Sequence, residues 1–334
     1  MPAPRHDPPE ANELARIAAT YTAFAVGEAR GWSGIYERLA LAVARSAELL
    51  AFIASMPAER RQPNLFLGAV RHVCGVPVDG DDLARRVAAE RARIRAVMLS
   101  RTTQTNEPGR CGVLLPVLAQ LPQPLALLEV GASAGLCLLP DRYGYDYATA
   151  RISPVVTATE SPPPLFACEV TGALPVPSAV PRVAWRCGLD LNPLDLRSAS
   201  DTEWLETLVW PEQDARAQRL RAAIAIARRD PPPVVRGNLL TDLEPLLAAA
   251  PRQATLVVFH TAVLAYVASQ AARERFAAMM RDANVVWISN EHPGVFPSLA
   301  AGVPASRQRR FLLMVNGKPL AWTGPHGQSI DWFG

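Results

Sequence analysis

The sequence predicts an α/β protein in two parts: an α-helical N-terminal domain at residues 11–121, then an α/β domain with a mostly parallel sheet at residues 122–334. Two observations carry this prediction. Strand patterns are almost absent before Leu125, whereas short apolar runs alternate with helical segments after it. The length of 334 residues also exceeds the size at which one hydrophobic core usually divides. Residues 1–10 are rich in proline and charge, so we expect disorder there and no signal peptide.

Apolar residues at three-to-four spacing predict the helices of the N-terminal domain. The expected helices cover residues 14–24, 35–53, 64–73 and 81–99. Asn64 is the expected cap of the third helix, and Asp81 or Asp82 that of the fourth.

Five strands in βα alternation, followed by a hairpin, predict the sheet of the second domain. The strands are expected at Leu125–Val130, Val183–Leu189, Val234–Arg236, Thr255–Phe259 and Asn284–Ile288. Asn316-Gly317 between two apolar runs is a strong signal for the hairpin. By analogy between folds, an antiparallel ending favours a Rossmann-like, methyltransferase-type sheet over an all-parallel dinucleotide-binding one. A Pro-rich insertion at residues 143–181 separates the first two strands, and Leu165–Val170 is expected to form a small hairpin within it.

Composition excludes several classes of function. The net charge is only +3, and no basic patch with interleaved aromatic residues occurs, so nucleic acid is not an expected partner. No apolar run is long enough to span a membrane, and a cytoplasmic location is expected. The five cysteines are irregularly spaced and include no CxxC pair, so neither a disulfide framework nor a metal site is expected.

The segment after the first strand has the pattern of a cofactor-binding loop. Gly131, Ser133 and Gly135 follow an apolar strand and precede an expected helix, so small residues could let backbone N–H groups approach a ligand. Glu129 lies two positions before the first glycine, where a carboxylate could meet the ammonium group of S-adenosylmethionine. The loop departs from Gly-x-Gly-x-Gly because Ser133 replaces the middle glycine.

The same residues also read as Gly-x-Ser-x-Gly, the nucleophile elbow of α/β-hydrolases. In that alternative Ser133 is the nucleophile of a serine hydrolase, and His260 or His292 is its base. A third interpretation is that small residues here only permit tight packing.

Two further residues favour the cofactor interpretation. Asp190 ends the second strand, where an acid can bind both hydroxyls of a ribose. Asn238 follows the third strand and could offer a donor and an acceptor to an adenine edge. A loop cap at Asp190 and a turn at Asn238 are the alternatives. One adenosine pocket accounts for both residues, whereas an elbow serine accounts for neither.

The remaining candidates are polar residues expected near the same crevice. His260, Glu291 and His292 follow the fourth and fifth strands and are candidates for substrate binding or general-base catalysis. Tyr266 follows the fourth strand and is expected to line the pocket. The polar segment Thr103–Arg110 precedes the first strand, so its residues Asn106, Glu107 and Arg110 could contact a ligand or form an interhelical loop.

Several motifs together resemble the bacterial domain-of-unknown-function family DUF2332, from about Thr20 to the C-terminus. The motifs are QTNEPGR, EVGASAGL, DRYGYDY, GLDLNPLDL, LVWPEQ, RGNLL and VVFHTAVLAYV. The family resembles class I S-adenosylmethionine-dependent methyltransferases in its sheet. The resemblance implies cofactor-loop roles for Glu129, Gly131 and Gly135, a ribose acid at Asp190 and an adenine contact at Asn238. Cys137 and Asn238 stand where the family tends to have Asn and Asp.

These observations lead to three hypotheses. The first is an S-adenosylmethionine-dependent methyltransferase that acts on a small molecule, with the helical domain selecting the substrate. The second is the serine hydrolase with Ser133 as nucleophile. The third is a non-catalytic protein of the same fold that binds a metabolite. The sequence predicts neither the methyl acceptor nor the oligomeric state.

Overall fold

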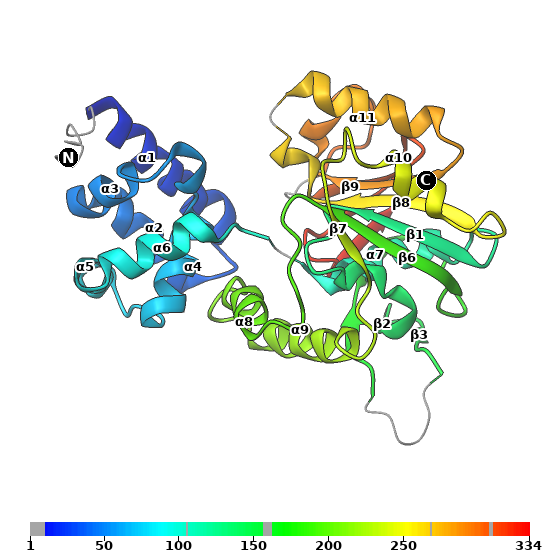
Figure 1. Cartoon of the computed structure of the whole chain (residues 1–334), viewed down its shortest axis with the longest axis horizontal. Coiled ribbons are helices and arrows are strands. Elements are labelled where there is room, and N and C mark those ends of the chain that lie inside the picture. The colour runs from blue at the N-terminus through cyan, green and yellow to red at the C-terminus, as the bar shows by residue number, and fades with distance from the viewer. Residues whose placement is uncertain (1–10, 105, 156–161, 268, 307–309) are drawn as a thin grey trace. The chain divides into compact units, whose positions relative to one another are not determined.

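A computed structural model describes residues 11–104, 106–155, 162–267, 269–306 and 310–334 (Figure 1). Residues 1–10, expected to be disordered, lie outside the described residues, as do Thr105 of the polar segment and residues 156–161 of the Pro-rich insertion. The chain forms two compact units: residues 1–105 with 203–217, and residues 106–202 with 218–334.

The first unit is built from helices, and polar capping residues divide two of the long expected helices into shorter ones. Ser46 accepts a hydrogen bond from the Leu49 N–H and ends the expected helix 35–53 in its middle. Glu90 separates two helices in the expected segment 81–99, and Asp79, rather than Asp81 or Asp82, caps the first of them. Pro63, rather than Asn64, begins its helix. The helices are α1 Ala11–Phe24, α2 Gly34–Arg45, α3 Ala47–Ala54, α4 Pro63–Cys74, α5 Gly80–Ala89 and α6 Arg91–Ser100, with a π-helical turn at Ala25–Ala29 and a 3₁₀ turn at Ala58–Arg60.

A segment from the middle of the chain completes the first unit. Trp204 is fully buried in the core of this unit and donates its indole N–H to the Thr102 carbonyl at 2.9 Å. Trp210 packs against the same core and donates to Asn64 Oδ1 at 3.0 Å. The helices α8 Ala199–Thr207 and α9 Asp214–Ala227, which extend into both units, carry this segment. The expected N-terminal domain, residues 11–121, does not contain residues 203–217, which belong to the first unit.

The second unit is a mixed α/β structure around a large, mostly parallel sheet. Its strand order is β5-β12-β11-β10-β9-β8-β1-β6-β7. The five strands β7, β6, β1, β8 and β9 are parallel neighbours, and β10 and β11 form the expected antiparallel hairpin. The bounds are β1 Leu125–Val130, β5 Glu169–Gly172, β6 Val183–Asp190, β7 Val234–Arg236, β8 Thr255–Thr261, β9 Val286–Glu291, β10 Phe311–Val315, β11 Lys318–Thr323 and β12 Ser329–Trp332.

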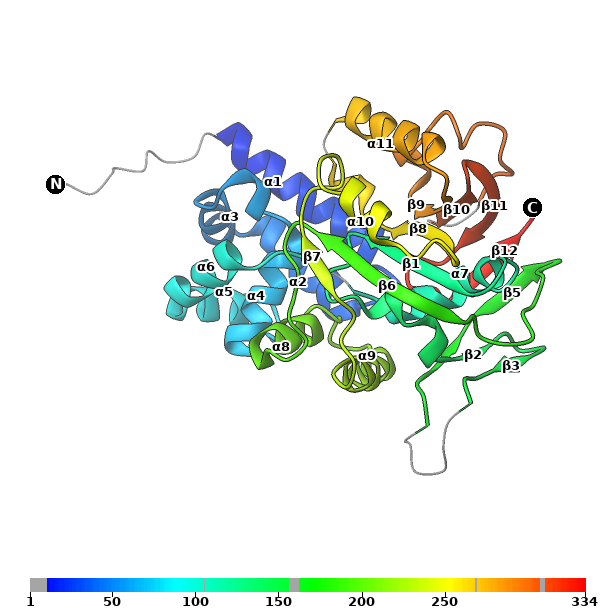
Figure 2. The ribbon, with the colours of Figure 1, turned by 45° about the vertical axis from the view of Figure 1, so that its right-hand side comes forward.

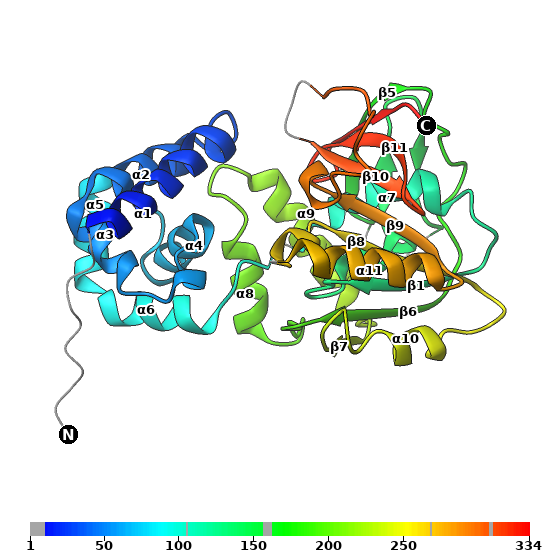
Figure 3. The ribbon, with the colours of Figure 1, turned by 90° about the horizontal axis from the view of Figure 1, so that it is seen from above.

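Helices cover both faces of this sheet (Figures 1 and 2). On one face α10 Glu244–Ala249 and α11 Gln270–Asp282 are present, and Figure 3 shows α11 running along β8 and β9. Phe276 of α11 packs there against Val258 and Trp287. On the other face lies α7 Cys111–Leu118, in which every residue is buried. This burial explains why α7 belongs to the second unit rather than to the N-terminal helices.

The connection from β1 to β6 contains a second sheet instead of a long helix. Its three strands are β2 Gly144–Asp146, β3 Arg151–Ile152 and β4 Leu165–Ala167, in the order β3-β2-β4. The hairpin expected at Leu165–Val170 is wrong, because β4 pairs with β2 whereas β5 pairs with β12 of the large sheet. The helix expected after the glycine loop is also absent: residues 131–143, all described, contain only 3₁₀ turns at Leu136–Leu138 and Pro140–Arg142.

Candidate functional site

The candidate site lies at the carboxyl ends of the parallel strands. Because β1, β6, β7, β8 and β9 run in the same direction, the loops that follow them meet at one edge of the sheet. The first three 3₁₀ turns of this region are η3 Pro108–Arg110, η4 Leu136–Leu138 and η5 Pro140–Arg142. Two more, η6 Leu264–Tyr266 and η7 Pro293–Val295, follow β8 and β9.

The loop after β1 has left-handed backbone at three positions. The φ angles of Gly131, Ser133 and Gly135 are +74°, +54° and +75°. A Cβ at Gly131 would lie 2.3 Å from Cγ2 of Val263, so a side chain of the protein already fills the space beside this glycine. Glycine is therefore required at position 131 for conformation and for packing against the loop after β8.

Asp190 connects the loops after β1 and β6. Its Oδ2 accepts the Ser133 N–H at 2.8 Å and its Oδ1 accepts the Asn192 N–H at 2.7 Å. The expected proximity of Asp190 to the glycine loop is thus present. The carboxylate acts as a loop cap, which was the alternative to a ribose contact.

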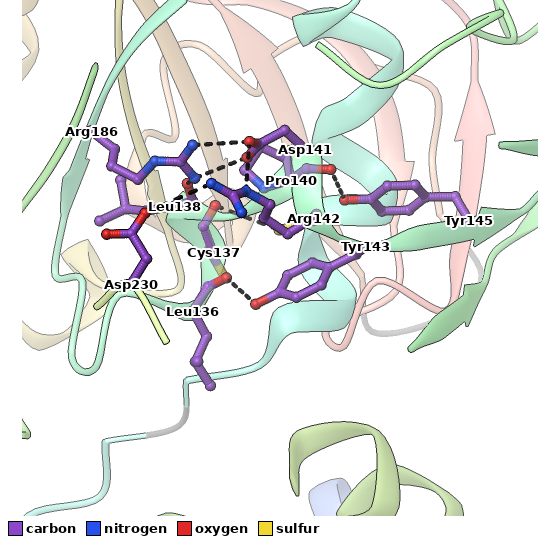
Figure 4. Close-up of polar contacts among 11 residues, drawn as sticks. Leu136, Cys137, Leu138, Pro140, Asp141, Arg142, Tyr143, Tyr145, Arg186 and Asp230 are labelled. Atoms are coloured by element: carbon purple, nitrogen blue, oxygen red, sulfur yellow. Dashed lines mark hydrogen bonds and ion pairs between the residues drawn. The ribbon is translucent and has the colours of Figure 1, made fainter. Parts of the chain in front are cut away.

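Side chains of β6, of β2 and of the residue before β2 hold the 3₁₀ turns in place (Figure 4). Arg186 binds both oxygens of Asp141 at 2.9 Å and also donates to the Leu138 carbonyl at 2.8 Å. The buried hydroxyls of Tyr143 and Tyr145 donate to the carbonyls of Leu136 and Pro140. These bonds replace the backbone ladder that a helix would provide after the glycine loop.

Glu129 is a buried carboxyl group at the end of β1. Its side chain faces the α7 side of the sheet, its Oε2 atom has no hydrogen-bond partner, and it is 2% exposed. Burial raises its pKa well above the usual value, the Cys137 thiol adds to this, and Arg110 opposes it. The balance favours the uncharged acid, which could become a carboxylate if a cation were to bind beside it.

The segment 106–110 lies at the carboxyl edge of the sheet, as one of its two interpretations required. Asn106 Oδ1 accepts the Leu136 N–H at 2.8 Å, and Arg110 donates to the Thr261 carbonyl at 2.9 Å. Glu107 caps η3 by accepting the Gly109 N–H, and its carbonyl accepts a bond from the Cys137 thiol. All three side chains are buried. Asn106 and the Glu107 carbonyl bind residues of the loop after β1, and Arg110 binds Thr261 at the end of β8.

A buried chain of hydrogen bonds joins Trp287, His260 and Glu291. The Trp287 indole N–H donates to His260 Nε2 at 3.0 Å, and His260 Nδ1 lies 2.7 Å from Glu291 Oε1. Because an indole can only donate, Nε2 is the acceptor and the His260 proton is on Nδ1. Both ring nitrogens are therefore engaged and the side chain is fully buried. This geometry speaks against His260 as a general base and assigns it a structural role.

Glu291 fixes the loop after β8. Its Oε1 also accepts the backbone N–H groups of Val263 and Leu264 at 2.8 and 3.1 Å. The preceding residue, Ala262, has a φ of +57° and donates to the Asn290 carbonyl. Glu291 thus holds Val263 in the position where it packs on Gly131, and it is a positioning residue rather than an exposed base.

Three predicted residues are exposed. The Nδ1 of His292 accepts the Gly294 N–H at the start of η7, and the Oδ1 of Asn238 accepts the Leu240 N–H in a turn. Tyr266 is 68% exposed at the end of η6. Asn238 therefore has the turn role that was the alternative to ligand binding, and His292 also has a local turn role. The hydrolase geometry is absent as well, because the buried Ser133 hydroxyl has no hydrogen-bond partner and hence no histidine base.

The sequence interpretation omitted Asn290, Thr261 and Thr323. Strand alternation places them with Glu129 on the α7 face at the carboxyl edge, where all four are buried. Thr261 pairs with Asn290 in the sheet, and the Thr323 hydroxyl donates to Asn290 Oδ1 at 2.7 Å. The signal in the sequence was the run Ser289-Asn290-Glu291, three polar residues at the end of a strand otherwise expected to be apolar.

In the described part of the chain, no cluster of three or more His, Cys, Asp or Glu side chains could hold a metal ion. All five cysteines are free thiols. None of the described helices combines the length and the apolar character that crossing a bilayer requires.

Comparison with known proteins identifies the family. Residues 78–332 match the model of the family described as an uncharacterized protein conserved in bacteria (DUF2332). The chain belongs to this family, as the motifs quoted from its sequence indicated. No curated protein and no solved structure matches the chain.

Proposed function

We propose that the chain is an S-adenosylmethionine-dependent methyltransferase that binds its cofactor at the carboxyl ends of the parallel strands around β1 and acts on a small molecule. The observation that carries the proposal is the order of the parallel strands. Numbered along the chain, β1, β6, β7, β8 and β9 lie in the order 3-2-1-4-5. This order is that of doubly wound nucleotide-binding sheets, and its switch point lies between β1 and β8. In such sheets, ligands bind outside the carboxyl ends of the strands at that point.

The loop after β1 favours a ligand without phosphates. A pyrophosphate usually binds to free backbone N–H groups at a helix N-terminus. Here, no helix follows Gly135 directly, and the N–H groups of residues 131, 132, 133, 135 and 136 donate within the protein. The loop therefore offers a ligand mainly side-chain atoms. S-Adenosylmethionine, which has an adenosine but no phosphate, fits this donor set better than a dinucleotide does.

The polar atoms at this edge fit the parts of that cofactor. The buried Glu129 Oε2 and Ser133 Oγ have no partners, and either could accept a hydrogen bond from the ammonium group. The Asp190 carboxylate, at the end of β6 and beside the loop after β1, is the acid that would bind the ribose hydroxyls. When bound, the cofactor supplies an electrophilic methyl group. The chain then contributes binding and orientation, which alone can supply much of the rate enhancement. His260 has no role in proton transfer in this proposal.

Isothermal titration calorimetry with S-adenosylmethionine and S-adenosylhomocysteine tests the proposal. We expect micromolar binding that Asp190→Ala weakens at least tenfold, about 1.4 kcal/mol. Asp146→Ala is the matched control, because Asp146 caps a turn through the Ala148 N–H with the same spacing but lies in the small sheet. A melting curve of each variant separates loss of the loop cap from loss of a ligand contact. No binding of either ligand by folded protein would refute the proposal.

Turnover distinguishes an enzyme from a binding protein of the same fold. The protein is incubated with labelled S-adenosylmethionine and a bacterial small-molecule extract, and release of S-adenosylhomocysteine is measured. Label in the small-molecule fraction supports a methyltransferase. Cofactor binding without turnover on any fraction would assign the chain to metabolite binding instead.

A further inference from the structure

Arg110 is a buried cation without a counter-charge. It is 6% exposed, and its hydrogen bonds run from Nε to the Pro325 carbonyl and from Nη1 to the carbonyl and hydroxyl of Thr261. Among the residues that the structure describes, no carboxylate forms an ion pair with it. Glu129 is the acid whose pKa Arg110 lowers, but burial has the larger effect and favours the uncharged form. A buried guanidinium normally has an anionic partner, because leaving its charge uncompensated is costly.

A second unsatisfied donor lies on the same face of the sheet. Asn290 is fully buried, and its Nδ2 has no hydrogen-bond partner, because the Thr323 hydroxyl donates to Oδ1 and leaves the amide nitrogen pointing elsewhere. Arg110 bonds to Thr261 of β8, and its guanidinium lies 5.9 Å from the Phe311 ring of β10. Since β9 lies between these two strands, Arg110 crosses the end of β9, where Asn290 projects on the same face.

We propose that Arg110 and Asn290 form a binding site for a carboxylate group of the ligand. The guanidinium supplies the charge and its Nη2 donors, which make none of the bonds above, and the Asn290 amide supplies a further donor. A planar carboxylate matches such a pair of donors in charge and shape. The site itself does not depend on the cofactor. That the carboxylate belongs to the amino-acid part of S-adenosylmethionine, rather than to the methyl acceptor, rests on the proposed function.

Asn290→Asp is the decisive variant, because it is nearly isosteric and places a carboxylate of the protein beside Arg110. It should block the site from within. Asn316→Asp is the matched control: it adds the same charge to the same unit in the β10–β11 turn, and its Oδ1 can still accept the Trp287 N–H. The full-length variants are melted in sodium acetate and in sodium chloride at equal ionic strength. We expect acetate to raise the melting temperature more than chloride in the wild type and in Asn316→Asp, and not in Asn290→Asp.

Two cofactor fragments identify the source of the carboxylate. S-Adenosylhomocysteine carries the amino-acid group, whereas 5′-methylthioadenosine has the same nucleoside and sulfur without it. If the carboxylate is that of the cofactor, Asn290→Asp weakens S-adenosylhomocysteine at least tenfold and leaves 5′-methylthioadenosine within twofold. An acetate effect with both affinities unchanged assigns the site to the acceptor. This acetate result does not require cofactor binding, so the site can hold even where the proposed function fails.

Thr323→Val provides a second variant that tests the same site without adding charge. It removes the hydroxyl that orients Asn290, and we expect it to reduce the acetate effect or the S-adenosylhomocysteine affinity at least threefold. The proposal is overturned if acetate and chloride act equally on the wild type and Asn290→Asp leaves the S-adenosylhomocysteine affinity unchanged.

Discussion

Replacing Gly131 by alanine tests why the loop after β1 needs glycine. At a φ of +74° an alanine costs about 1–2 kcal/mol. Its Cβ would also lie 2.3 and 2.6 Å from Cγ2 and Cγ1 of Val263, and overpacking of this kind costs about 1–3 kcal/mol. We therefore expect Gly131→Ala to lower the free energy of unfolding by about 2–5 kcal/mol. Val263→Ala removes both methyl groups and should cost about 1 kcal/mol alone.

The double variant separates the two causes. Once the Val263 methyl groups are gone, only the cost of the left-handed backbone remains, so the double variant should be more stable than the sum of the single effects by about 1–3 kcal/mol. The assay is equilibrium urea unfolding of the full chain, with a separate transition allowed for each compact unit. Additive effects, or a cost below about 1 kcal/mol for Gly131→Ala, would show that contact with Val263 is not the reason why position 131 requires glycine.

Three further predictions concern buried polar groups. Because burial raises the pKa of Glu129, its contribution to stability is complete below the unfolded pKa of about 4.3 and is lost as pH rises through the folded pKa. Glu129→Gln should therefore gain stability over the wild type between about pH 5 and 8, as melting temperatures across that range would reveal. Arg186→Met leaves the Asp141 carboxylate without its bidentate partner and should destabilise the protein by about 2–3 kcal/mol in urea unfolding. Ser133→Ala removes an unpartnered buried hydroxyl, so stability should stay within about 1 kcal/mol, and the wild type should not react with a fluorophosphonate probe.

The centre of the sheet was predictable because its strands β1, β8 and β9 are largely buried on both faces. The run Leu125–Val130 is buried at every position, and its apolar run matches β1 at both ends. The parallel strands and the hairpin are confirmed, with the largest shift at β9, which begins at Val286 and continues to Glu291. The connection from β1 to β6 was not predictable in the same way, since β2, β3 and β4 are two to three residues long in a Pro-rich segment.

The candidate site was only partly predictable, because polar residues acquire their roles from partners distant in sequence. The contact of Asp190 with the glycine loop follows from two adjacent parallel strands, and the position of Asp190 at the end of the second expected strand indicated it. The burial of His260 depends on Trp287 and Glu291, which are 27 and 31 residues away, and on strand register. The pairing of Thr261 with Asn290 likewise requires the register of β8 and β9, which no local pattern specifies.

The division of the first unit between two chain segments affects the timing of its synthesis. Its helices up to residue 105 leave the ribosome roughly 100 residues before the segment 203–217 that carries Trp204 and Trp210. At about 5–20 residues per second, that delay is about 5–20 s. The Glu212 carboxylate, which accepts the Ile35 N–H at the start of α2 at 2.7 Å, arrives equally late. During this interval the nascent helices expose the apolar surface that Trp204 later covers, so this unit completes its core only after the segment 203–217 has been made.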